Sequence, residues 1–160
     1  MSLVTMREIL PYAEEKKIAI PAFNIDTMEI TQAILETVEE ENCPAIIAVG
    51  QAAIKDGKLE SLAATVRTLA KDMKTPVVLH LDHGQSVEQV VKALCAGFTS
   101  VMIDGSKLSF EDNIALTRQV VEYAHDHGVV VEGELGTLAG VEDEVKVSAE
   151  DSSYTHPEEV

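Results

Sequence analysis

Short apolar runs that alternate with longer amphipathic stretches constrain the fold of this chain more than any other feature. The apolar runs, each bounded by turn residues, predict strands at residues 18–24, 45–49, 77–81, 100–104 and 129–135. The amphipathic stretches predict helices at residues 28–41, 59–74, 86–96 and 109–127, after a leading helix at 5–16. Because a helix joins each strand to the next, the strands are expected to run parallel, and their composition predicts burial on both faces.

Residues at the helix ends agree with these boundaries. Ser86 and Ser109 stand at predicted helix starts, where a hydroxyl accepts a hydrogen bond from a free backbone N–H. Gly97 and Gly128 stand at predicted helix ends, where a left-handed residue is common. No linker, repeat or low-complexity tract interrupts the series, so residues 1–160 are predicted to belong to one domain without an internal boundary.

Two architectures accommodate five parallel strands joined by helices. A TIM (β/α)8 barrel needs about 250 residues, so this α/β chain of 160 residues would supply about the first five strands. A doubly wound open sheet favours a glycine-rich phosphate turn after its first strand, and residues 20–26 contain no glycine. The sequence therefore favours the barrel, with the open sheet as the alternative.

The charge balance limits the classes of partner. The chain has 28 acidic and 12 basic residues and a formal net charge of -16, which repels nucleic-acid phosphates and anionic lipids. We therefore expect no nucleic-acid partner and no membrane association. The N-terminal residues lack the basic start and apolar core of a signal peptide, and no apolar run approaches a membrane span. These features predict a cytoplasmic protein.

The cysteines and most histidines are not predicted to take part in chemistry. Cys43 and Cys95 lack CxxC spacing and are expected to be buried thiols. His80 lies inside a predicted strand, where a core role and a ligand role both remain open. The other histidines outside the strand ends are expected to be solvated: His125, His127 and His156.

Polar side chains gather where the predicted strands end. In parallel α/β proteins the active site forms at the carboxyl ends of the strands. Four of these ends carry groups that bind metals or move protons: Asn24 and Asp26 on the first strand, residues 80–84 on the third, Asp104 on the fourth, and Glu132 and Glu134 on the fifth. The sequence therefore predicts a site at this edge of the sheet.

The densest of these segments is His-Leu-Asp-His-Gly at residues 80–84. Asp82 and His83 are expected to point in different directions, one available as a proton carrier and the other as an imidazole ligand. A hydrogen-bonded turn would explain this pair if it stood alone. Carboxylates on the neighbouring strand ends would crowd together without benefit, however, and a bound cation would relieve that crowding.

Residues 136–144, after the fifth predicted strand, have glycines at positions 136 and 140 and acidic residues at 142–144. Such a segment is typical of a mobile loop over an active site. An exposed acidic connection is the alternative interpretation.

Several segments together resemble one known family, the class II fructose-bisphosphate and tagatose-bisphosphate aldolases. The matching segments are residues 21–24, 79–84, 96–106, 113–117, 132–136 and 141–143, which follow the family order along nearly the whole chain. The most specific are Leu-Asp-His-Gly at 81–84 and Phe-Thr-Ser-Val-Met-Ile-Asp-Gly-Ser at 98–106. The resemblance implies a zinc-dependent lyase of carbohydrate metabolism and glycolysis that reversibly cleaves a ketohexose 1,6-bisphosphate to dihydroxyacetone phosphate and glyceraldehyde 3-phosphate. It also implies a homodimer or homotetramer.

The resemblance further implies roles for individual residues. His83 would be a ligand of the catalytic Zn²⁺, and Asp82 would be the acid that protonates the aldehyde oxygen during condensation. Asp104 and Glu134 match positions of a possible second metal ion. Glu142 matches the loop carboxylate that moves the carbon-bound proton.

Other positions match the family less closely. Asn24 and Ser106 are expected to bind substrate, and Glu132 is expected to lie behind the metal ligands. Relatives often carry a serine where this chain has Gly50 followed by Gln51. The resemblance also implies two further zinc histidines and phosphate-binding turns, which would lie beyond residue 160.

Two alternatives to the aldolase remain at this stage. The first is a non-catalytic half barrel, truncated or assembled with a partner that supplies the missing strands and zinc ligands. The second is a barrel metalloenzyme of unrelated chemistry. Within the aldolase interpretation, the choice between fructose and tagatose bisphosphate depends on one stereocentre and stays open.

Overall fold

The computed structural model describes residues 2–142, 145–150 and 152–160. Five strands form one parallel sheet in sequence order: β1 (Ala22–Asn24), β2 (Ala45–Val49), β3 (Val77–Gly84), β4 (Ser100–Ile103) and β5 (Val130–Gly133). The helices of the α/β series are α1 (Met6–Lys16), α2 (Met28–Glu41), α3 (Gln51–Lys55), α4 (Leu59–Leu69), α5 (Val87–Ala96) and α6 (Phe110–His125). A two-stranded antiparallel ribbon, β6 (Gly140–Glu142) with β7 (Val145–Val147), follows β5. Short 3₁₀ helices, η1 (Ala70–Asp72) and η2 (Pro157–Glu159), complete the elements.

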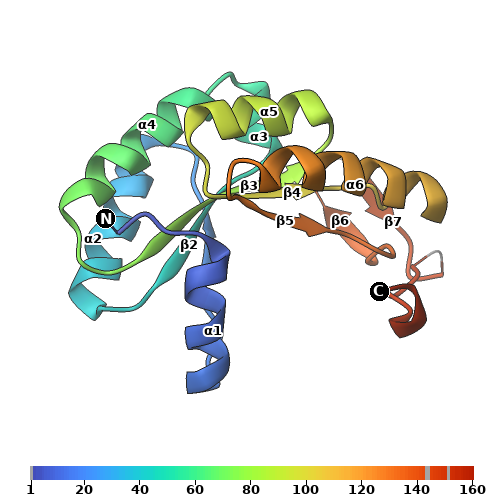
Figure 1. Ribbon diagram of the computed structural model, residues 1–160, viewed down its shortest axis with the longest axis horizontal. Coiled ribbons are helices and arrows are strands. Elements are labelled where there is room, and N and C mark those ends of the chain that lie inside the picture. The colour runs from blue at the N-terminus through green and yellow to red at the C-terminus, as the bar shows by residue number, and fades with distance from the viewer. Residues whose placement is uncertain (1, 143–144, 151) are drawn as a thin grey trace.

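The helices that connect the strands pack on one side of the sheet. Figure 1 shows α4, α5 and α6 together along one face, with α1 projecting from the other side. A doubly wound sheet carries connecting helices on both faces, whereas a barrel carries them only outside. The strand order β1-β2-β3-β4-β5 without a reversal also agrees with the barrel. The prediction of a TIM-barrel chain with five of its strands is confirmed.

The two faces of the sheet have separate apolar clusters. Residues of β2 to β4 that face the helices form the larger cluster and include Ile47, Leu79, Val101 and Ile103. Alternate residues point the other way, where Ile46 and Val78 pack with Met6 and Ile9 of α1. The leading helix therefore covers the amino-terminal end of the inner face and leaves the carboxyl end to polar residues.

The edge strands depart from the predicted burial on both faces. All five residues of β2 are buried, and so are all four of β4. All three residues of β1 are exposed, and those of β5 are intermediate or exposed. The prediction was wrong for these two strands because each has a neighbouring strand on one side only.

The prediction of buried thiols was also wrong, since Cys43 and Cys95 are both exposed. Cys95 lies on α5, whose buried face carries Val90 and Ala93, so a residue two positions beyond Ala93 turns outward. Cys43 follows Asn42, the left-handed residue that ends α2. Both sulfurs therefore lie outside the apolar clusters.

The helix-end predictions are confirmed. Ser86 and Ser109 accept hydrogen bonds from the backbone N–H groups three residues later, at 3.3 and 3.1 Å. Gly97 and Gly128 have φ angles of 93° and 71°. Short α3, which the sequence did not predict, follows β2 directly at Gln51. No helix among the described residues is both long and apolar enough to cross a membrane.

The end of β3 departs from a regular strand. Leu81 pairs with Val101 and Gly84 with Ile103, so three steps along β3 match two steps along β4. The extra residue lets β3 present both Asp82 and His83 toward the inner face, and His83 has a φ of 48°. Gly84 then lies so close to β4 that an added Cβ would be 2.5 Å from the carbonyl oxygen of Met102.

This close approach predicts the effect of substitution at Gly84. Gly84→Ala is expected to lower the free energy of unfolding by about 1–3 kcal/mol, because the obstructing atom belongs to the backbone and cannot rotate away. Gly133→Ala on β5 is the control, since its Cβ would lie at an ordinary 3.5 Å from Thr117. Urea unfolding of both variants tests the prediction, and equal stability of Gly84→Ala and wild type would contradict it.

Candidate metal centre

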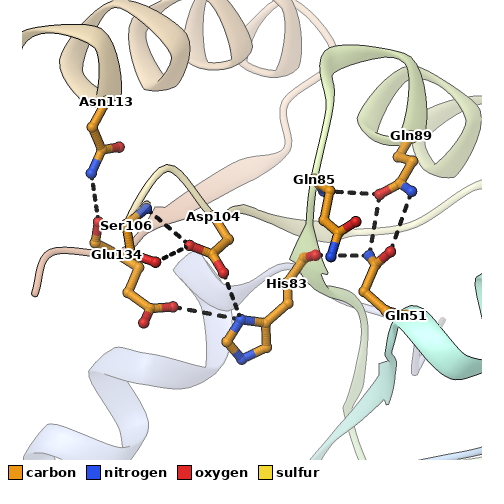
Figure 2. Close-up of polar contacts among 8 residues, drawn as sticks. All are labelled: Gln51, His83, Gln85, Gln89, Asp104, Ser106, Asn113 and Glu134. Atoms are coloured by element: carbon orange, nitrogen blue, oxygen red, sulfur yellow. Dashed lines mark hydrogen bonds and ion pairs between the residues drawn. The ribbon is translucent and has the colours of Figure 1, made fainter. Parts of the chain in front are cut away.

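Three strand ends bring an imidazole and two carboxylates together. His83 Nδ1 lies 3.2 Å from Asp104 Oδ2 and 3.5 Å from Glu134 Oε2. One candidate ligand atom from each residue lies within 4.8 Å of the other two. Figure 2 shows the three side chains converging from β3 and from the segments that follow β4 and β5. The structure thus places the three predicted metal ligands at one point.

The protonation equilibria of this cluster are coupled. Burial lowers the pKa of His83, but the hydrogen bond to Asp104 and the charges of Asp82 and Glu134 outweigh it, so the pKa is raised overall. Burial raises the pKa of Asp104, but hydrogen bonds from Ser106 and His83 outweigh it, so this pKa is lowered. Both shifts favour the charged form of the group, the imidazolium of His83 and the carboxylate of Asp104, so the site favours positive charge beside negative charge, as a bound cation would require.

The donor set fits a divalent metal such as zinc. Zinc accepts imidazole nitrogen and carboxylate oxygen, and two ligand atoms on a tetrahedral ion with bonds of about 2.1 Å lie about 3.4 Å apart. The observed separations of 3.2 and 3.5 Å from His83 Nδ1 are close to that spacing. The chemistry of His83, Asp104 and Glu134 and these two separations therefore fit the binding of one divalent ion.

Two neighbouring residues hold Asp104 and Glu134 in place, one through the carboxylate and the other through the backbone. The Ser106 hydroxyl donates to Asp104 Oδ1 at 2.6 Å, and the Ser106 backbone N–H donates to the same oxygen at 3.0 Å. Asn113 of α6 donates through Nδ2 to the backbone carbonyl of Glu134 at 2.7 Å. Ser106 was predicted to bind substrate, and that role stays a prediction beside its observed contact with Asp104.

The sequence reasoning missed a pair of glutamines beside His83. Gln51 is 1% exposed, and its Nε2 donates to the His83 carbonyl at 2.7 Å and to Gln89 Oε1 at 3.1 Å. Asn113, also missed, is buried on α6. For Asn113 the available signal was an amide side chain within a predicted helix, since a buried amide costs free energy unless it is hydrogen-bonded. For Gln51 no such signal was available, because the short helix α3 was not predicted.

Asp82 points toward the other half of the sheet. A Cβ placed on Gly50 would lie 3.9 Å from both Asp82 Oδ2 and Asn24 Nδ2, so these groups flank the open space above Gly50. Asp82 thus faces β1 and β2 while His83 faces the ends of β4 and β5, as predicted for this pair. Asp26, in contrast, pairs with Lys58 at 2.9 Å and lies outside the cluster.

A second polar group occupies the inner face below the centre. His80 Nδ1 lies 2.8 Å from Ser100 Oγ, and its Nε2 lies 3.6 Å from Glu132 Oε2. Burial lowers the pKa of His80 to about 4. Burial also raises the pKa of Glu132, with a further contribution from Asp82. His80 is therefore a hydrogen-bonded core residue in this structure, one of the two roles that the sequence left open.

The remaining predictions concern the segment after β5 and the outer histidines. Gly140–Glu142 belongs to β6, so part of the predicted loop is a strand. The side chain of Glu142 and residues 143–144 lie outside the part of the chain that the structure describes. His125, His127 and His156 are exposed, as predicted.

Comparison with known proteins identifies the family. The family model for fructose-bisphosphate aldolase class-II matches residues 4–160. The chain is 50% identical to the fructose-bisphosphate aldolase of Thermus caldophilus over 98% of its own length and 51% of that protein. It is 49% identical to the probable fructose-bisphosphate aldolase of Bacillus subtilis, over 99% and 56% of the two lengths. The chain belongs to the class II fructose-bisphosphate aldolase family.

Solved structures agree with this assignment. The chain superposes with a TM-score of 0.85 and 34% identity on a putative fructose-1,6-bisphosphate aldolase from Coccidioides immitis, over 96% of its own length and 54% of the other. The YdjI aldolase from Escherichia coli K12 gives a TM-score of 0.79 at 34% identity, with 84% and 52% covered. The chain thus spans about half the length of the relatives that it matches.

The buried imidazole of His80 predicts a pH dependence of stability. The folded-state pKa is lowered from 6.5 to about 4, so between these values the unfolded chain binds more protons at this position than the folded chain. Stability from neutral His80 is present above pH 6.5 and is lost as the pH falls toward 4. Relative to His80→Gln, wild type is expected to lose roughly 2 to 3 kcal/mol across this window.

Urea unfolding at a series of pH values measures this difference. The exposed His125→Gln variant is the control for an imidazole that is not buried. A constant stability difference between wild type and His80→Gln from pH 7 to pH 4 would show that burial does not keep His80 neutral.

Proposed function

We propose that this chain carries the metal and proton-donor side of a zinc-dependent class II aldolase active site. The observation that supports the proposal is the convergence of His83, Asp104 and Glu134 at the carboxyl end of the sheet, in a chain that belongs to this family. The reaction would be reversible cleavage of a ketohexose 1,6-bisphosphate to dihydroxyacetone phosphate and glyceraldehyde 3-phosphate. The protein would thus act as a lyase on sugar phosphates.

The metal would be held by His83, with Asp104 and Glu134 as ligands of the same ion or of a second one. The chemistry that bound zinc supplies is polarisation of a carbonyl oxygen and stabilisation of the negative charge that develops when a proton leaves carbon. The protein would contribute the fixed arrangement of ligands. Ser106 would keep one Asp104 oxygen engaged, so that the other faces His83.

Asp82 is proposed as the group that moves a proton to and from the aldehyde oxygen. It follows Leu81 at the carboxyl end of β3 and faces the space above Gly50. Asn24, on the other side of that space, would donate from its amide to a substrate oxygen. Because Gly50 has no side chain, this space is open to a substrate between the amide and the carboxylate.

Other roles in the proposal come from the family. Glu142 would move the carbon-bound proton, and Ser106 would also contact substrate when it binds. A cytoplasmic homodimer or homotetramer is proposed, with fructose bisphosphate as the first substrate to test because the relatives bear that name. Tagatose bisphosphate is the second substrate to test.

Substitution of Asp82 separates proton transfer from metal binding. Asp82→Ala is expected to retain zinc and to lower the cleavage rate by about 100- to 10,000-fold, the contribution of a positioned proton donor. Cleavage of fructose 1,6-bisphosphate is followed by trapping the triose phosphates, with zinc content measured on the same samples. Asp126→Ala, an exposed aspartate after α6, is the control for loss of a carboxylate.

Two outcomes would contradict this part of the proposal. Cleavage by Asp82→Ala at the wild-type rate would exclude the acid role. Absence of cleavage by the zinc-loaded wild-type protein would exclude the proposed activity for this chain as it stands.

Substitution of the carboxylate ligands tests the metal centre directly. Asp104→Ala and Glu134→Ala are each expected to weaken zinc binding by about 100-fold or more, beyond the 10- to 100-fold typical of residues behind the ligands. Competition with a chelating dye measures the dissociation constant. Glu14→Gln on α1, an exposed acid at the opposite end of the sheet, should bind zinc as wild type does. Unchanged affinity in both ligand variants would exclude this set of ligands.

A further inference from the structure

The backbone of His83 has an unusual conformation for a residue in a strand. Among the described residues, three that are not glycine have positive φ: Lys17, Asn42 and His83. Lys17 and Asn42 end helices α1 and α2, where a left-handed residue closes the last turn. His83 ends no helix, so the packing around β3 must hold its φ of 48°.

The irregular step in β3 explains why this conformation matters. Leu81 and Gly84 pair with Val101 and Ile103, residues that face the helices. In a regular strand, the side chains of adjacent residues point to opposite faces. Asp82 and His83 could therefore not both reach the inner face of a regular β3. The extra residue and the left-handed φ of His83 turn its imidazole toward Asp104. Asp82 still points toward the space above Gly50.

One side of this turn is fixed by β4. Asp104 N–H donates to the Gly84 carbonyl at 2.8 Å, and Gly84 packs against the backbone of Met102. The other side is fixed by an amide side chain, because the His83 carbonyl accepts from Gln51 Nε2 at 2.7 Å. The backbone at His83 is therefore held from both directions.

The Gln51 amide is itself held by a second amide. Gln51 Nε2 also donates to Gln89 Oε1 at 3.1 Å, and Gln89 Nε2 donates back to Gln51 Oε1 at 3.3 Å. Gln89 Oε1 accepts a further hydrogen bond from the Gln85 backbone N–H at 2.8 Å. Figure 2 shows this pair beside His83, on the side away from Asp104 and Glu134.

The chemistry of the contacts fixes the orientation of both amides. A carbonyl oxygen only accepts hydrogen bonds, so the Gln51 nitrogen must face His83 and its oxygen must face Gln89. The Gln85 N–H only donates, so the Gln89 oxygen must face it. An amide at each position meets these requirements and also lets Gln89 Nε2 donate back to Gln51 Oε1. Apolar side chains in the same space would leave the His83 carbonyl and the Gln85 N–H without these partners.

We propose that Gln51 is a positioning residue for the metal centre: with Gln89, it holds the His83 backbone in its left-handed conformation and so aims the imidazole at Asp104 and Glu134. The inference rests on the proposed metal site for its functional meaning. The contact itself is independent of any metal. Gln51 thus acts through His83 and contacts neither the candidate ligand atoms nor the substrate space.

The test is Gln51→Met, which keeps the length of the side chain and removes its donor. Zinc affinity is expected to fall about 10- to 100-fold, the effect typical of partners that orient a ligand. In the metal-free protein, the three-bond NMR couplings that report φ of His83 are expected to leave the left-handed range. Gln85→Met is the matched control, because Gln85 contributes only its backbone N–H to the network.

The two readouts separate this inference from the proposed function. If wild type binds no zinc, the proposed metal site is wrong, and the couplings of His83 still decide whether Gln51 holds the backbone. A Gln51→Met protein with wild-type zinc affinity or with an unchanged φ at His83 would overturn the inference.

A second variant covers the case in which Gln51→Met does not fold. Gln89→Met removes the acceptor that fixes the Gln51 amide and leaves the donor to His83 in place. It is expected to shift both readouts in the same direction by a smaller amount. Wild-type values for both readouts in Gln89→Met, with Gln51→Met unfolded, would also overturn the inference.

Discussion

The parallel pairing of β3 with β4 and of β4 with β5 determines where every candidate ligand lies. Ile103, the last residue of β4, pairs with Gly133, the last residue of β5. Asp104 and Glu134 each follow directly, so they lie at the same level along the sheet. Both follow residues that face away from the inner side, and alternation turns both carboxylates inward. A slip of one residue in this register would turn one of them toward the helices. The sheet register therefore sets the positions of the candidate ligands. The residues that contact them set only the directions in which the ligand side chains point.

Each proposed ligand also has its own support from outside the sheet. The carboxylate of Asp104 is held by Ser106, the backbone of Glu134 by Asn113, and the backbone of His83 by Gln51. These supports come from a turn and from two different helices, so no single segment carries the arrangement. Two half-buried carboxylates that lie 3.2 and 3.5 Å from one imidazole nitrogen would lose conformational entropy on being held there if nothing else fixed them. Supporting hydrogen bonds keep the groups close enough to share a cation.

The sequence predicted the sheet well because the information was local. Apolar runs, cap residues and helical connections each depend on a few neighbouring positions, and the polar residues at strand ends followed from the general placement of sites in parallel sheets. The burial of β1 and β5 and the exposure of Cys95 were mispredicted, because burial depends on which elements pack beside a strand or helix. Gln51, Gln89 and the extra residue in β3 could not be read from the sequence, since their effect arises from contacts between α3, α5 and β3.

The extra residue in β3 also separates the two proposed roles, proton donation by Asp82 and metal binding by His83. Asp82 and His83 are adjacent in the chain, yet Asp82 faces the space bounded by Asn24 and Gly50 while His83 faces Asp104. A proton donor and a metal ligand on adjacent residues keep a nearly fixed separation, because one planar peptide joins their Cα atoms. Roles carried on two mobile loops would need ordering at each turnover. The irregular end of β3 thus provides, within one strand, the separation of proton transfer from metal binding that the proposed reaction requires.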